Sequence, residues 1–77
     1  DKMIRYFNDF IRTHYFLNAY TVTPDFITSL SKKSGVEFDK VQSLYYAIQR
    51  VSAAEEVNDF ELLSLNEQIQ LFYKKRN

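Results

Sequence analysis

The sequence contains no cysteine and no tryptophan, and it has a single glycine and a single proline. The absence of cysteine excludes a disulfide framework, a thiol nucleophile and a thiolate metal site. So little glycine and proline argues against a turn-rich β-sandwich or barrel. No apolar run approaches the roughly 20 residues that a membrane-spanning helix needs, so we expect no membrane insertion by this segment. These absences leave a compact helical domain as the expected class.

The 77 residues are enough for one small domain, which we expect to span residues 1–77. With 45% hydrophobic and 17% aromatic residues, the chain is too rich in core-forming side chains to be a disordered tail. Ten basic and ten acidic residues cancel, which argues against nucleic acid or an anionic membrane as partner. Helical periodicity follows Met3 at once, so we interpret the chain as a domain excised from a longer protein.

Hydrophobic periodicity predicts four helices, over about 2–20, 24–34, 38–52 and 59–76. Thr23 is expected to cap the second helix ahead of Pro24, and Gly35 to end it in the left-handed conformation. Asn58 is expected to cap the fourth helix, with Glu61 three residues later. The predicted core comprises Phe7, Phe10, Ile27, Leu30, Val41, Leu44, Ile48, Leu65, Ile69 and Phe72.

The fourth helix is apolar on two sides. Its main stripe holds Leu62, Leu65, Ile69, Phe72 and Tyr73, and roughly opposite lie Phe60, Leu63 and Leu71. Because so short a chain has little material to cover both sides, the second side predicts a surface for another protein or for a homodimer. The alternative is that neighbouring helices wrap both sides. Tyr46 and Arg50, on the outer face of the third helix, are a second choice of partner-binding residues.

The second and third helices, joined at Gly35, have the apolar spacing of a helix-turn-helix pair. This gives an alternative function, DNA binding, through Lys32, Lys33, Lys40 and Arg50. Glu37 and Asp39 lie at the start of the candidate recognition helix, where they would face phosphates. The same spacing also suits any tight helix pair, and we favour that purely structural interpretation.

The sequence shows no complete catalytic or metal-binding motif. His14, the single histidine, falls on the apolar side of the first helix, so we expect a mostly buried, neutral imidazole bonded to a tyrosine or a carbonyl. The acids around residues 55–61 lack the spacing of a calcium loop and are better explained by helix capping. We therefore expect no enzyme, no cofactor and no metal.

Three segments resemble an uncharacterised bacterial membrane-protein family. Residues 4–16, IRYFNDFIRTHYF, are similar to its aromatic helix with an Ile-Arg pair. Residues 25–46, DFITSLSKKSGVEFDKVQSLYY, resemble its Leu-Ser-x-Lys-Ser-Gly-Val turn, and residues 60–73, FELLSLNEQIQLFY, its closing helix. The resemblance implies the cytosolic C-terminal tail of a protein with membrane helices and an amidotransferase-like domain, encoded near MoxR-type ATPases. It assigns no activity and no functional residues.

Residues and resemblance together predict an all-α, four-helix domain with a helix-turn-helix-like central pair. The function that they favour is a non-catalytic protein–protein interaction module of unknown partner. We expect it in the cytoplasm, tethered to a membrane through a part of the protein outside this sequence.

Overall fold

The computed structural model describes residues 2–19 and 21–76, and these form four helices and no strand. The helices are α1 (Lys2–Tyr15), α2 (Pro24–Ser34), α3 (Phe38–Ala53) and α4 (Asp59–Lys75). The all-α class is therefore confirmed. The first helix stops at Tyr15, short of the predicted end near Tyr20, and Tyr20 itself lies outside the described residues.

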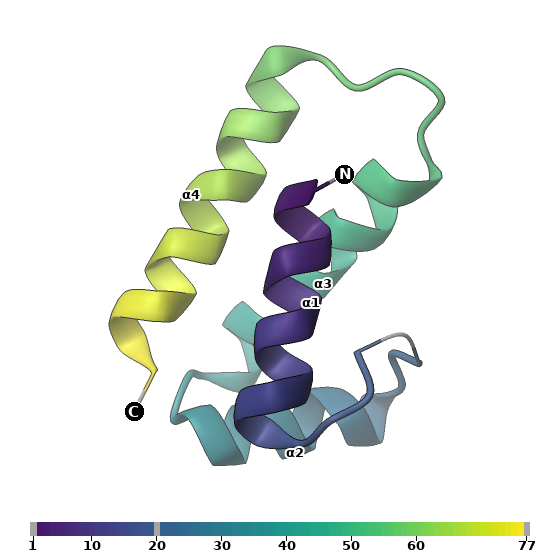
Figure 1. The fold of residues 1–77 in the computed structure, drawn as a ribbon. Helices are drawn as coiled ribbons and strands as arrows, with labels where there is room; N and C mark the ends of the chain where they lie inside the picture. The colour runs from purple at the N-terminus through teal and green to yellow at the C-terminus, as the bar shows by residue number, and fades with distance from the viewer. Residues whose placement is uncertain (1, 20, 77) are drawn as a thin grey trace.

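The helices pack around a single core, with α2 lying across one end of the molecule (Figure 1). Helix α4 forms one edge, so that one of its sides meets the core and the other faces outward (Figure 1). Aromatic side chains join the elements: the Phe7 and Phe72 rings are 5.3 Å apart, and the Phe26 and Tyr45 rings 5.1 Å apart. These contacts connect α1 to α4 and α2 to α3.

Local signals in the sequence fix both ends of α2. The Thr23 hydroxyl accepts a hydrogen bond from the Phe26 amide at 3.1 Å, and Pro24 opens the helix. Gly35 ends it with φ of 79°, where a side chain would be disfavoured. At the start of α4, the Asn58 side chain likewise accepts from the Glu61 amide at 2.7 Å. All three predicted caps are confirmed.

The core contains nine of the ten predicted residues, and Phe10 is the exception, since it is only partly buried. The cause is the rotation of α1. Its buried residues are Ile4, Phe7, Asn8, Ile11 and Tyr15, so the inward side is turned away from Phe10 and His14, which were expected to face the core. Phe10 consequently packs at the margin of the core, with its ring 5.0 Å from that of Tyr73.

The same rotation makes the prediction for His14 wrong. His14 is exposed rather than buried, and its ring stacks on Phe10 at 5.0 Å with an angle of 12° between the planes. Tyr15 takes the inward position instead, and its buried hydroxyl has no hydrogen-bond partner among the described residues.

Candidate interaction surface

Helix α4 buries one side and exposes apolar residues on the other. Leu65, Ile69 and Phe72 are buried in the core. Phe60, Leu63 and Leu71 are 77%, 59% and 52% exposed. We call these last three residues the α4 outer face. The helices of the described chain do not wrap it, which settles the alternative left open by the sequence.

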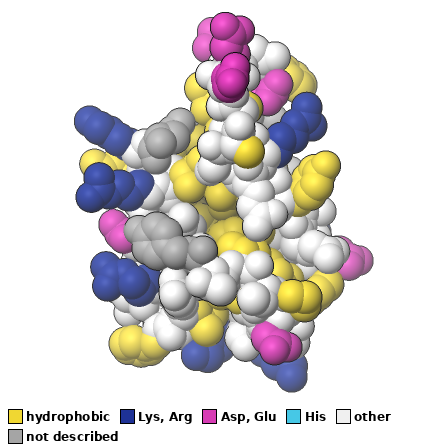
Figure 2. Space-filling model, turned by 90° about the vertical axis from the view of Figure 1, so that its right-hand side faces the viewer, with side chains coloured by type: hydrophobic (Ala, Val, Ile, Leu, Met, Phe, Trp, Pro, Cys, Tyr) yellow, Lys and Arg dark blue, Asp and Glu magenta, His cyan; other side chains and the backbone are white. Residues whose placement is uncertain are grey.

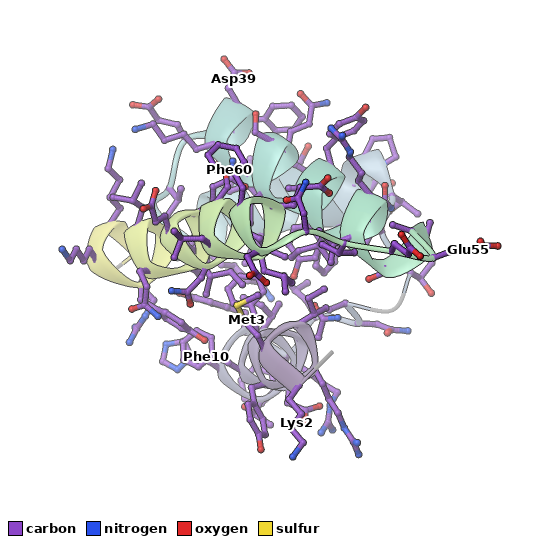
Figure 3. All side chains as sticks on the ribbon, turned by 90° about the horizontal axis from the view of Figure 1, so that it is seen from above. Lys2, Met3, Phe10, Asp39, Glu55 and Phe60 are labelled. Atoms are coloured by element: carbon purple, nitrogen blue, oxygen red, sulfur yellow. The ribbon has the colours of Figure 1, made fainter. Side chains whose placement is uncertain are left out.

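The three residues of the α4 outer face border different hollows. Phe60 lines one of about 320 Å³ between α3 and α4, and Leu71 lines another of about 350 Å³ between the same helices. Leu63 borders a third hollow, together with Met3 of α1. In the view along Figure 3, Phe60 lies between α4 and α3, while Met3 extends from α1 toward α4. The α4 outer face is thus one side of a helix bordered by hollows toward α3 and toward α1, and it is not a single pocket.

The second-choice residues on α3 are both exposed, and the structure places only one of them beside the α4 outer face. Arg50 lines the same hollow as Phe60, together with Ala47 and Glu61. Tyr46 is 69% exposed but borders none of the hollows described above. Arg50 therefore belongs to the candidate surface, and Tyr46 lies apart from it on the outer side of α3.

The hollow beside Leu71 brings together two lysines that are far apart in the sequence. Lys40 near the start of α3 and Lys75 at the end of α4 both line it, over apolar Val36 and Leu44. The pKa of Lys75 is lowered, chiefly by its hydrogen bond with the Lys40 side chain and by the positive charge there. The sequence did not predict this pair. Positions 40 and 75 come together only through the way α3 packs against α4, and no local pattern in the sequence indicates that packing.

The four residues of the DNA-binding alternative are exposed, and two of them lie among other groups. The Lys33 ammonium donates a hydrogen bond to the Tyr15 carbonyl at 3.0 Å, and so extends toward the end of α1. Lys40 shares its hollow with Glu37 and Asp39, which interrupt its positive charge. Lys32 and Arg50 are exposed on different helices. A DNA-binding surface is expected to present a contiguous basic stripe, and the acids beside Lys40 count against one at that position.

Comparison with known families identifies the chain. Residues 1–76 match the family described as the DUF4350 C-terminal helical domain. The chain belongs to this family. No curated protein and no solved structure matches it. The expectation of a C-terminal domain from a family of unknown function is thereby confirmed, and the DUF4350 match itself assigns no activity.

The described residues of this DUF4350 domain contain no cluster of side chains that could bind a metal ion. Among residues 2–19 and 21–76, no group of three or more His, Asp or Glu side chains could hold an ion. The acids of the α3–α4 connection, Glu55 and Glu56, are exposed, and Glu55 extends outward in Figure 3.

None of the described helices has both the length and the apolar character needed to cross a bilayer.

Proposed function

We propose that this domain is a non-catalytic protein–protein interaction module that docks through the α4 outer face. The observation that carries the proposal is the exposure of Phe60, Leu63 and Leu71 on a helix whose opposite side is already buried in the core. More than half of each of these three side chains is exposed, and aromatic residues such as Phe60 are enriched at protein interfaces. Arg50 beside Phe60 adds a cation of the kind enriched at such sites.

The resemblance to the bacterial family supports a location for the module. We place it on the cytosolic side of a membrane protein, as the tail that follows membrane helices and an amidotransferase-like domain. In that setting the apolar side of α4 would be free to meet a cytosolic protein. The encoding of such proteins near MoxR-type ATPases names a class of partner worth testing.

Site-specific photo-crosslinking tests the proposal in cells that express the full-length protein. A photoreactive amino acid replaces Leu63 in one variant and Thr28, an exposed residue on α2, in the control. We expect a discrete covalent adduct from position 63 that is absent from position 28. Adducts of the same pattern from both positions, or no adduct from position 63, would overturn the proposal.

A titration with duplex DNA distinguishes the module from the helix-turn-helix alternative. The amide signals of the domain are followed by NMR at low salt, where even weak phosphate contacts are strongest, and then at higher salt. We expect no shifts that concentrate on residues 32–50. Shifts confined to that range, and lost as salt rises, would instead favour DNA binding through Lys32, Lys33, Lys40 and Arg50.

A further inference from the structure

The outward side of α4 carries a short seam of four exposed residues, Phe60, Ser64, Glu67 and Leu71. Their spacing of four, three and four residues aligns them along one side of the helix. The order of these spacings is the same whether the helix is followed from its N-terminus or from its C-terminus. When a second α4 is laid antiparallel over the first, Phe60 meets Leu71 of the other copy, and Ser64 meets its Glu67. A twofold contact therefore uses every seam residue and places none opposite itself.

Charge along α4 is arranged for the same antiparallel pairing. The connection before the helix holds Glu55 and Glu56, and Asp59 opens its first turn, whereas Lys74 and Lys75 close its last turn. Figure 2 shows acidic side chains gathered at the top of the molecule, at the level of the α3–α4 connection. In the register set by the seam, the acidic end of one copy lies against the basic end of the other. Antiparallel helix dipoles add to this attraction.

The hollow beside Leu71 contains two lysines, Lys40 and Lys75, that could pair with the acids of a second copy. Lys40 and Lys75 approach each other there, and the negative charge of Glu37 acts on Lys75 in opposition to Lys40. Two like charges held side by side are stabilised when an external carboxylate comes between them. Position 56 of a second copy falls opposite position 75 in the antiparallel register. Glu56 of that copy would add a carboxylate beside the lysine pair, in addition to Glu37 and Asp39 of the lysines' own chain.

We propose that a second copy of this chain is the occupant of the α4 outer face, bound through antiparallel α4 helices. The proposal rests on the proposed function, because it names the partner of the same surface. A net charge of zero removes long-range repulsion between copies. Parallel pairing is disfavoured, since it would set Glu67 against Glu67 and the two lysine ends against each other. A contact made through one side of a single helix is small, so we expect the dimer to be weak and reversible.

Sedimentation velocity over a concentration series tests the dimer with the 77-residue chain. The wild type should change from monomer to dimer as concentration rises, and Phe60→Asp should weaken dimerisation at least tenfold. Phe16→Asp is the matched control, because Phe16 is another largely exposed phenylalanine, at the end of α1. Circular dichroism confirms that both variants fold. A wild type that stays monomeric at millimolar concentration, or a Phe16→Asp variant as weakened as Phe60→Asp, would overturn the proposal.

Engineered disulfides test the antiparallel register, since the chain has no native cysteine. Ser64→Cys and Glu67→Cys are prepared as separate single variants, which prevents disulfides within one chain. Mixed together under mild oxidation, they should give the heterodisulfide faster than either variant gives its homodisulfide. A parallel pair would reverse that preference, because it places each position against itself. Equal rates for all three products would indicate random collision and would also overturn the register.

Charge reversal tests the contact between Glu56 and the lysine pair. Glu56→Lys should weaken dimerisation, and adding Lys75→Glu in the same chain should restore it, because the two substitutions exchange the partners. No restoration would remove Glu56 from the contact.

The outcomes separate this inference from the function on which it rests. A monomeric chain whose position 63 crosslinks to a different protein rejects the second copy and keeps the interaction module. A monomeric chain with no crosslink at position 63 rejects both. A crosslink from position 63 to another molecule of the same protein supports both.

Discussion

Two helices of this domain end in the left-handed conformation, and only one of them does so with glycine. Gly35, with φ of 79°, follows α2, and its amide donates to the Ser31 carbonyl at 2.9 Å. Phe16, with φ of 59°, follows α1 in the same way and donates to the Arg12 carbonyl at 3.0 Å. A residue with a Cβ atom is destabilised in this conformation by roughly 1–2 kcal/mol, although asparagine tolerates it better.

The cost at Phe16 can be measured by comparing two substitutions. Phe16 is 85% exposed, so about 15% of a ring side chain of about 200 Å² is covered, equivalent to about 0.7 kcal/mol. Phe16→Ala removes those contacts and retains the Cβ clash. Phe16→Asn removes them as well but relieves the backbone. We therefore expect the asparagine variant to be more stable than the alanine variant by about 0.5–1 kcal/mol.

Gly35→Ala should destabilise the domain, in contrast to the relief of the backbone expected from asparagine at position 16. The alanine introduces the Cβ clash at φ of 79°, while reducing the entropy of the unfolded chain by an amount worth about 0.4–1 kcal/mol. The net expectation is a loss of about 0.5–1 kcal/mol.

Urea unfolding followed by circular dichroism measures all three variants, provided that the slope of the transition stays constant. For a domain of this size, 1 kcal/mol corresponds to a shift in Tm of about 4–8 °C, which is readily resolved. Equal stability of Phe16→Asn and Phe16→Ala, or a Gly35→Ala variant as stable as the wild type, would refute the reasoning about left-handed helix ends.

Three further predictions follow from the caps, the core and a buried tyrosine. Thr23→Ala and Asn58→Ala should each lower the free energy of unfolding by about 1 kcal/mol, because each removes a side-chain acceptor from a helix start, and urea titration should detect both losses. Leu30→Ala should lower it by about 2–5 kcal/mol, since Leu30 is fully buried, and calorimetry should show a lower Tm. Burial raises the pKa of Tyr45 above its ordinary value of about 10, and repulsion from Tyr73 raises it further. The folded state then retains a proton that the unfolded state releases, so stability should fall as pH rises above about 10. Tyr45→Phe should flatten that decline in urea titrations at increasing pH, and an unchanged decline would contradict the assignment.

Features set by neighbouring residues were predictable from the sequence. Thr23 before Pro24, Gly35 after a run of helix formers, and Asn58 three residues before Glu61 each act through hydrogen bonds or torsion angles within one turn. Such signals do not depend on the rest of the fold. The predicted bounds of α2 accordingly agree with the structure.

The rotation of α1 was not predictable, because the helix offers two overlapping apolar stripes. Phe7 and Ile11 belong to both, and the choice lies between His14 and Tyr15 as the next inward residue. Packing against α4 decides it, since the Tyr15 ring makes an edge contact with Phe72. The early end of α1 likewise had no signal, because phenylalanine is not a residue typical of left-handed helix ends.

The candidate surface shows the same division. That α4 has a second apolar side is a property of its own periodicity, and the exposure of Phe60, Leu63 and Leu71 agrees with it. Which hollows those residues border depends on how α3 packs against α4, which the sequence does not reveal. The binding role of the surface stays a prediction.

Exposure alone does not distinguish the α4 outer face, because Phe16 is more exposed than any of its members. Phe16 stands at a helix end, and no seam or gradient of charge accompanies it. Phe60 and Leu71 instead share a line on one long helix, with an acidic start and a basic end on the same element. A serine or lysine at position 60 would serve the fold equally well, since the core does not contact most of that side chain. This alignment of apolar residues with charge is the basis of the proposed association, which the dimerisation and crosslinking experiments test.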